Sequence, residues 1–280
     1  MTSFSFEVFP PKTEIGLARF GDVADELMGL RPDYISVTYG AGGSDQHRSF
    51  EAISRVVESG ADVAGHLTCV GQSKADIDAV LARYRDLGVD HVVALRGDPP
   101  TGIDAPYEPH RDGYTSTAHL VSTAKRMGVE TVSVSGYPEV HPQSPSADHD
   151  LAILGAKVDA GADRAITQMC FDTDMIVRYA ERVAAAGIDA EVVPGIFPIH
   201  SFPSIVRFAG RCGAAIPAGV AARFAGLDDD ADMSEKLGAE FAVEQIERLA
   251  AHGIDRVHLY TINRPSLARL VVDQLRVPAS

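Results

Sequence analysis

Glu7 is an acidic residue in an otherwise largely apolar segment near the start of the chain. The segment is Phe4-Ser5-Phe6-Glu7-Val8-Phe9-Pro10-Pro11. An acid among three phenylalanines and two prolines is a candidate for burial, and burial disfavours the charged form of a carboxyl group and raises its pKa. A general acid that works near neutral pH needs such a raised pKa. Glu7 is therefore predicted to be a general acid; the alternative is a carboxylate that only caps or salt-bridges.

A second group of chemically capable residues is Arg96-Gly97-Asp98-Pro99-Pro100, which follows a short apolar run. Gly97 permits a close backbone approach, and the two prolines stiffen the chain that leaves it. Asp98 could hydrogen-bond a heterocycle and Arg96 could hold a phosphate. An internal ion pair between Arg96 and Asp98 is the alternative interpretation.

Two histidines and one lysine complete the candidates, namely His66, His141 and Lys157. Neither histidine has the spacing of a zinc site, so a hydrogen bond to a ligand or a structural role is favoured and no metal is predicted. Lys157 is either a surface lysine or a phosphate contact. No GxSxG elbow is present, and Cys69 has no evident base, so nucleophilic catalysis is not supported.

Composition restricts the partners. The 280 residues contain 25 Lys and Arg against 39 Asp and Glu, a formal net charge of −14, and a field of this sign repels nucleic acid and anionic membrane surfaces. An anionic ligand therefore needs a locally basic or helix-N-terminal site. Cys69, Cys170 and Cys212 form no CxxC pair, and the first residues show no signal-peptide pattern. Both features predict a cytoplasmic protein.

Short apolar runs alternate with longer amphipathic segments along almost the whole chain. The runs are rich in Val, Ile, Phe and Tyr, which is typical of strands buried on both faces. Strands are predicted at residues 3–8, 34–37, 62–67, 91–95, 131–135, 164–167, 190–193 and 256–260. Helices are predicted at residues 17–30, 46–59, 74–87, 174–186 and 233–252, with Gly60, Gly88, Gly187 and Gly253 at helix ends that need a left-handed residue.

Eight strands with intervening helices predict an α/β fold, a (β/α)8 TIM-like barrel that occupies residues 1–280 as a single domain. A doubly wound open sheet is the structural alternative. The barrel is favoured because the strand count is eight and because no dinucleotide fingerprint is present. The nearest match begins at Gly40, and Asp45 stands where GxGxxG needs its last glycine.

The barrel also predicts which residues meet, because active sites are built where the strands end. Polar residues at the expected strand ends are Glu7, Thr38, Tyr39, His66, Thr68, Arg96, Asp98, Tyr137, His141, Gln168 and Arg264. The longest irregular stretches, residues 97–113 and 136–147, also follow strands and are expected to be functional. The acidic run at residues 227–232 is interpreted as a helix cap and not as a metal site.

Several motifs resemble those of bacterial methylenetetrahydrofolate reductases, in the same order and over nearly the whole chain. They are Phe6-Glu7-Val8-Phe9-Pro10-Pro11-Lys12, Ser36-Val37-Thr38-Tyr39-Gly40-Ala41, His66-Leu67-Thr68-Cys69, Ala94-Leu95-Arg96-Gly97-Asp98, Tyr137-Pro138-Glu139-Val140-His141-Pro142, Lys157-Val158-Asp159-Ala160-Gly161-Ala162, Ala165-Ile166-Thr167-Gln168, Val193-Pro194-Gly195-Ile196 and Tyr260-Thr261-Ile262-Asn263-Arg264. Any one of these motifs is weak, whereas the ordered set is specific. The chain resembles the catalytic barrel alone, without the regulatory domain of eukaryotic relatives.

The resemblance implies a ping-pong reaction in which NADH or NADPH reduces FAD, and 5,10-methylenetetrahydrofolate then takes the hydride to become 5-methyltetrahydrofolate, which feeds methionine synthesis. Glu7 matches the family's general acid, and Asp98 matches the aspartate near the flavin and the pterin. Gln168, Phe208 and Arg264 match substrate-binding positions. The family also suggests a homo-oligomer.

For FAD, the resemblance implies binding by Thr38, Tyr39, Ala41, His66, Arg96, Gly97, Asp98, Tyr114, Tyr137, His141, Asp150 and Lys157. The chain departs from the family where an asparagine and an arginine are expected, because Ile153 and Ala156 occupy those positions. Each loss costs roughly 1–3 kcal/mol of binding, so weaker FAD retention is predicted.

Three other functions are consistent with parts of the sequence. A flavin-independent reductase would transfer hydride from NADH directly to the folate, and Ile153 and Ala156 favour it. A folate-dependent methyltransferase on a related barrel would need an acceptor site, usually with a metal or a corrinoid partner, and the sequence shows no cluster of metal ligands. A barrel that only binds folate has no need for Glu7 and Asp98.

Overall fold

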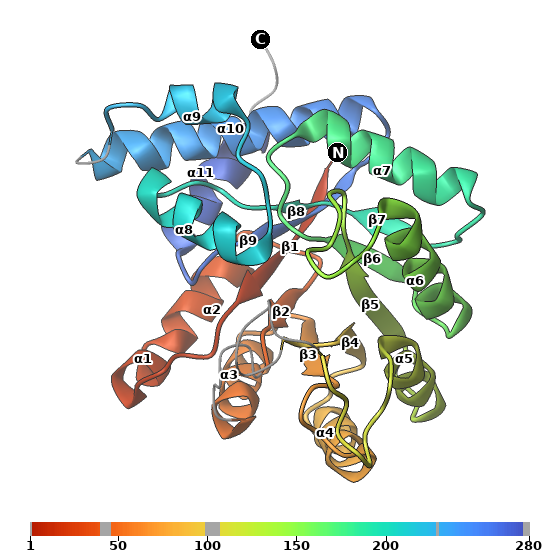
Figure 1. Ribbon diagram of the computed structural model, residues 1–280. Helices are drawn as coiled ribbons and strands as arrows, with labels where there is room; N and C mark the ends of the chain where they lie inside the picture. The colour runs from red at the N-terminus through yellow and green to blue at the C-terminus, as the bar shows by residue number, and fades with distance from the viewer. Residues whose placement is uncertain (1, 40–45, 99–106, 228–229, 277–280) are drawn as a thin grey trace.

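Parallel strands alternate with helices and curve into a barrel (Figure 1). The computed structural model describes residues 2–39, 46–98, 107–227 and 230–276. The strands are β1 Ser3–Val8, β2 Ile35–Val37, β3 Val63–Thr68, β4 His91–Leu95, β5 Thr131–Gly136, β6 Arg164–Thr167, β7 Glu191–Val193, β8 Gly195–Ile196 and β9 Arg256–Tyr260. They pair in the order β7-β6-β5-β4-β3-β2-β1-β9-β8, which confirms the predicted barrel.

The seventh position of the barrel differs from the prediction, because two short strands stand where one was expected. Pro194 separates β7 from β8, and a proline has no N–H to donate to a strand ladder. β7 pairs with β6, whereas β8 pairs with β9. The carbonyl of Pro194 accepts a hydrogen bond from the His258 N–H at 2.8 Å. The described residues therefore form nine strands on eight barrel positions.

Helices surround the strands (Figure 1). They are α1 Glu14–Ala18, α2 Phe20–Met28, α3 Gln46–Glu58, α4 Lys74–Asp86, α5 Thr117–Arg126, α6 Ala147–Asp159, α7 Thr173–Ala185, α8 Phe202–Cys212, α9 Ala218–Arg223, α10 Ala231–Ala251 and α11 Pro265–Arg276. Their apolar faces pack on the strands in a core that includes Phe6, Leu27, Ile53 and Val92. Within the described ranges, no helix combines the length and apolar character needed to cross a bilayer.

Two helix predictions can be compared with the structure in detail. The first predicted helix, residues 17–30, is wrong in its start, because the Thr13 hydroxyl accepts from the Gly16 N–H and the chain is helical from Glu14. This segment also divides at Arg19 into α1 and α2. The predicted cap of α10 is confirmed at Asp230, whose carboxylate accepts from the Met233 N–H at 3.0 Å; residues 228–229 lie outside the described residues. The four predicted helix-end glycines all have positive φ.

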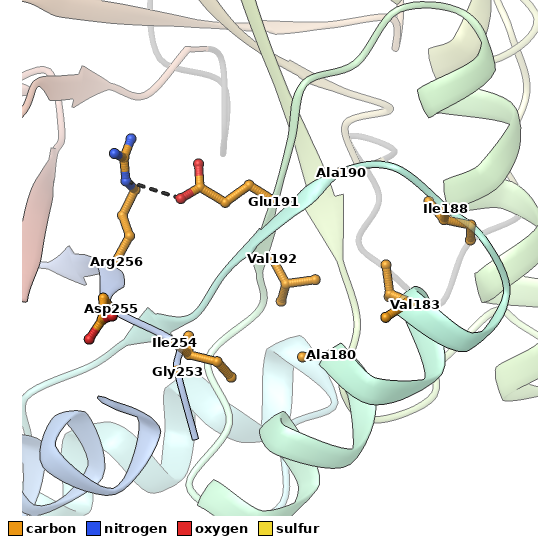
Figure 2. Close-up of a pocket in the computed structure, with 11 residues that line it drawn as sticks. Ala180, Val183, Ile188, Ala190, Glu191, Val192, Gly253, Ile254, Asp255 and Arg256 are labelled. Carbon is orange, nitrogen blue, oxygen red and sulfur yellow. Dashed lines mark ion pairs between the residues drawn. The ribbon is translucent and has the colours of Figure 1, made fainter. Parts of the chain in front are cut away.

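Charged side chains bind one another at the amino end of the barrel. Arg256 Nε lies 3.2 Å from Glu191 Oε1 and 3.6 Å from Asp33 Oδ2, and Arg164 Nε lies 3.1 Å from Glu191 Oε2. Beside the Arg256–Glu191 pair is a hollow of about 260 Å³, lined by side chains of α7, β7 and the turn before β9 (Figure 2). The ion pairs therefore join β7 to β9 where no backbone ladder connects these two strands.

Candidate active site

A cavity of about 1220 Å³ opens at the carboxyl ends of the strands. This is the end of a (β/α)8 barrel at which catalytic residues gather. The predicted site residues that line the cavity are Glu7, Thr38, Tyr39, His66, Arg96, Gly97, Asp98, Tyr137, His141, Asp150, Lys157, Gln168 and Phe208. Residues of β1, β3, α6 and α8, and the residues that follow β2, thus reach one space, which is large enough for two ring systems.

Two predicted site residues that the structure describes, Tyr114 and Arg264, do not line the cavity. Ala41 lies outside the described residues. Tyr114 is buried, and its phenol oxygen accepts a hydrogen bond from the Thr123 hydroxyl at 2.9 Å. Arg264 is half exposed and donates to the carboxylate of Glu235 on α10. In this conformation Tyr114 therefore has a packing role, and Arg264 is held by an ion pair.

Glu7 is buried at the end of β1 and faces two histidines. Its Oε2 atom lies 3.5 Å from His66 Nε2 and 3.9 Å from His258 Nε2. Ser36 Oγ lies 3.2 Å from each of those two ring nitrogens, and Ser5 Oγ lies 2.6 Å from His258 Nδ1. The carboxyl group of Glu7 therefore stands at the cavity end of a buried hydrogen-bonded network.

The charge state of His66 decides how this network acts on Glu7. Burial lowers the pKa of His66 to about 4, although the nearby Glu7 carboxylate opposes this shift. His66 is consequently a neutral imidazole near pH 7. A neutral imidazole can orient the carboxyl group of Glu7 by hydrogen bonding, but it does not hold that group in a strong ion pair.

Sequence reasoning missed Ser36, His258 and Tyr260 as parts of this site. All three face inward because side chains on a strand alternate between its two faces. Ser36 is two residues before Thr38, and His258 is two residues before Tyr260. Period-two alternation along the predicted strands could therefore have identified them. Tyr260 lines the cavity and donates to the Thr167 carbonyl at 2.7 Å.

Arg96, Gly97 and Asp98 form the cavity wall after β4. The Arg96 guanidinium lies 5.1 Å from the ring centroid of Tyr107, and its Nη2 atom lies 4.0 Å from Asp98 Oδ1. Gly97 has a φ of 80°, and a Cβ atom here would lie 2.5 Å from Val70 Cγ1 and 2.9 Å from Thr68 Cβ. Glycine is thus required at this position. The long Arg96–Asp98 contact leaves both side chains able to bind a ligand.

Lys157 is buried on α6, so its interpretation as a surface lysine is wrong. Its Nζ atom donates to the Ser135 carbonyl at 3.1 Å. Burial lowers the pKa of Lys157 to about 8, while Asp150 acts in the opposite direction. The Asp150 carboxylate also accepts from the His141 N–H at 2.9 Å. A cation and a fixed loop therefore stand together beside the cavity, where they can bind a phosphate.

Ile153 and Ala156 differ in where they lie on α6. Ile153 lines the cavity with 44% of its side chain exposed, whereas Ala156 is exposed outside the cavity lining. Ile153 therefore places an apolar side chain on a wall that Lys157 makes basic. Across the described residues, no three His, Cys, Asp or Glu side chains are grouped to hold a metal ion.

Gln168 and Phe208 add an amide and an aromatic ring to the cavity lining. Gln168 follows β6, and its Oε1 atom accepts from the Met169 N–H at 3.0 Å, which leaves its amide N–H groups for a ligand. Phe208 of α8 is 37% exposed and packs against Phe197 with 5.5 Å between ring centroids. These two side chains can therefore bind a flat heterocycle with polar edges.

Comparisons with known proteins agree with this geometry. The family model described as methylenetetrahydrofolate reductase matches residues 1–276. The chain is 38% identical over 274 residues to 5,10-methylenetetrahydrofolate reductase of Escherichia coli K12, covering 98% of this chain and 90% of that protein. It is 37% identical to methylenetetrahydrofolate reductase (NADH) 1 of Arabidopsis thaliana, of which it spans 46%. A Clostridium thermocellum protein described as binding two copies of 5-methyl-5,6,7,8-tetrahydrofolic acid shares the fold, with a TM-score of 0.65 and 14% identity, over 98% of this chain and 95% of that one.

Proposed function

The chain belongs to the methylenetetrahydrofolate reductase family, and from this premise we propose that it reduces 5,10-methylenetetrahydrofolate to 5-methyltetrahydrofolate with electrons from NADH or NADPH. The observation that carries the proposal is the placement of Glu7. A buried carboxyl group faces the cavity beside a neutral imidazole, and Asp98 and Gln168 line the same space. An acid, an anion and an amide around one cavity suit the opening and reduction of a cyclic aminal.

Glu7 performs the proton step in this proposal. Its carboxylic acid donates a proton to the folate nitrogen that leaves the methylene bridge, and the bond between that nitrogen and the bridge carbon breaks. The bridge carbon then forms an iminium with the remaining nitrogen and accepts a hydride to become the methyl group. The negative charge of Asp98 stabilises the cationic iminium, and Gln168 holds the pterin edge through its free amide N–H groups.

The cavity is suited to FAD in size and charge, and FAD supplies hydride transfer when bound. Its volume of about 1220 Å³ accommodates a flavin with a stacked substrate. Lys157 and Arg96 are the cations that would hold the diphosphate, while Tyr137 and His141 border the same wall. Thr38 and Gln168 also line the cavity and would contact the cofactor or the substrate when these are bound.

A second mechanism is favoured by one observation, the apolar Ile153 side chain on the cavity wall. Direct reduction of the folate by NADH, without a flavin, needs the same acid and the same Asp98. It does not need a polar side chain at position 153. The two mechanisms therefore predict the same product and differ in whether a flavin must be present.

An anaerobic visible spectrum of the purified protein, recorded after FAD and then NADH are added, tests the proposal. Protein-bound flavin bands that NADH bleaches and methylenetetrahydrofolate restores, with 5-methyltetrahydrofolate as product, are the expected result. NADH consumption with methylenetetrahydrofolate in the absence of any flavin would establish direct transfer instead. Folate binding without NADH oxidation under either condition would show a barrel that only binds folate, and the proposal would be wrong.

A further inference from the structure

Arg211 is a cavity residue to which neither the sequence motifs nor the reaction assigns a role. It lies in the last turn of α8, is exposed, and lines the cavity. The other lysine and arginine side chains that line the cavity have partners, since Lys157 donates to Ser135 and Arg96 approaches Asp98. Among the described residues, Arg211 has neither a hydrogen bond nor an ion pair. The chain has 39 acidic residues against 25 Lys and Arg, so carboxylates that could pair with an arginine are in excess.

The neighbours of Arg211 on α8 leave space for an extended ligand. Phe208 precedes Arg211 by three residues, so the two side chains lie on one face of the helix, about one turn apart. Gly210 also lines the cavity, and a Cβ atom added there would have no atom within 4 Å. A ring packed on Phe208 could therefore continue as a chain past Gly210 and reach Arg211.

A basic residue in the last turn of a helix also interacts favourably with the helix dipole. Arg207, about one turn earlier on α8, donates to Ser204 at 3.1 Å and does not line the cavity. The dipole therefore accounts for a positive charge near the end of α8, and it does not account for a guanidinium that lines the cavity without a partner. That group is placed to bind an anion.

We propose that Arg211 binds the glutamate carboxylate of the folate, an inference that rests on the proposed function. Glu7, Asp98 and Gln168 act on the pterin end, and Phe208 packs on the aryl group that follows it. The glutamate is joined to that aryl group by one amide, so its carboxylate is the next charged group along the ligand. An arginine fork binds a carboxylate through two parallel hydrogen bonds.

Steady-state kinetics of Arg211→Met tests this assignment, with Arg207→Met as the matched control. Each protein is assayed with 5,10-methylenetetrahydrofolate and with 5,10-methylenetetrahydropteroate, which lacks the glutamate. Arg211→Met should raise the KM for the folate about tenfold or more, because a charge-assisted hydrogen bond is lost. The KM for the pteroate, the KM for NADH and both kcat values should stay within about twofold. Arg207→Met should match the wild type, and Arg211→Lys should recover part of the affinity.

Equilibrium binding of 5-methyltetrahydrofolate to the same proteins gives a readout that is independent of turnover. An equal rise in KM for the folate and the pteroate would assign Arg211 a structural role and overturn the proposal. A rise in the KM for NADH alone would show that Arg211 binds a dinucleotide phosphate, which also overturns it. A wild-type protein that turns over neither folate would contradict the proposed function itself, whereas unchanged Arg211→Met kinetics would contradict only this assignment.

Discussion

The two ends of the barrel use charge in opposite ways. At the amino end, Arg164 and Arg256 are each ion-paired with Glu191, at 3.1 and 3.2 Å, and the Arg256–Glu191 pair lies beside a small hollow (Figure 2). At the carboxyl end, Glu7 faces neutral His66 at 3.5 Å, and Arg211 has no partner among the described residues. The charged side chains at the amino end therefore pair with one another, whereas those at the carboxyl end include groups that can still bind a ligand.

The two ends of one sheet therefore serve different purposes: charged residues at the amino end stabilise the fold, and those at the carboxyl end are available for ligands. Charges that bind one another join strands, as Arg256 and Glu191 join β9 to β7. A charged side chain that lines a cavity without a partner remains available to a ligand of opposite charge. Residues at the amino end should therefore alter unfolding, and residues at the carboxyl end should alter catalysis.

The largest expected effect comes from a matched pair of substitutions, Glu7→Gln and Glu191→Gln. Glu7→Gln removes the transferable proton and should lower kcat for methylenetetrahydrofolate about 10²–10⁴-fold, while NADH binding is retained. Glu191→Gln should leave kcat within about twofold and lower the free energy of unfolding by about 1 kcal/mol, because its half-exposed ion pairs are screened by solvent. Steady-state assays and urea unfolding of both variants measure the two effects.

The opposite result for either variant would contradict the assignment of catalysis to the carboxyl end of the barrel and of stability to the amino end. A Glu191→Gln protein that folds with wild-type stability but loses turnover would place part of the catalytic machinery at the amino end. A Glu7→Gln protein with wild-type kcat would remove Glu7 from the reaction.

A smaller effect is expected at the basic wall of the cavity. Ile153→Asn should strengthen FAD binding about tenfold, because an amide can hydrogen-bond a nucleotide that the apolar side chain cannot. Fluorescence titration of FAD measures the dissociation constant, and Ala152→Asn on the preceding residue, which is exposed outside the cavity lining, is the control. An unchanged dissociation constant for Ile153→Asn would indicate that FAD does not contact this part of α6.

The smallest expected effect is a change in how the free energy of unfolding depends on pH, caused by a histidine at the amino end of the barrel. Burial lowers the pKa of His91, at the amino end of β4, to about 3, whereas an unfolded histidine titrates near 6.5. The unfolded chain therefore binds a proton that the folded protein does not, and the stability of the wild type falls as pH decreases from about 6.5 toward 3. His91→Gln removes this term. The difference in unfolding free energy between wild type and variant should shrink by about 1 kcal/mol per pH unit below pH 6.

Urea unfolding at pH 7.0, 5.5 and 4.5 measures that difference. Turnover by His91→Gln at pH 7 should stay close to the wild-type value, since His91 hydrogen-bonds Ser133 and does not line the cavity. A stability difference that is independent of pH would mean that His91 titrates alike in the folded and unfolded states, and the expected shift would be wrong.

Most of the barrel could be predicted because each strand has a local signature. The run at residues 91–95 is apolar and coincides with β4, and Glu7 falls at the end of β1 as expected. The division of the seventh strand was also detectable in principle, since Pro194 lies within it. What could not be predicted is which strand each fragment pairs with, because pairing depends on the closure of the whole ring.

The site was predictable as a set of residues but not as a set of contacts. Strand ends identify Glu7, Asp98 and Gln168 from the architecture alone. The contact between His258 and Glu7, at 3.9 Å, joins residues far apart in the sequence. It arises because β9 pairs with β1, which the sequence alone does not show. The ion pair of Arg264 could not be predicted either. Its partner Glu235 lies on α10, and no spacing in the sequence indicates that contact.

The position of β9 has a consequence for how the chain is made. β1 and β8 both pair with β9, and the contact between Ser5 and His258 spans 253 residues. On the ribosome, the first seven strands must wait as an open sheet with two unpaired edges until residue 260 is synthesised. Such edges bind other chains readily, and contacts this distant in sequence form slowly. The last strand therefore limits both the folding yield and the moment at which His258 joins His66 beside Glu7.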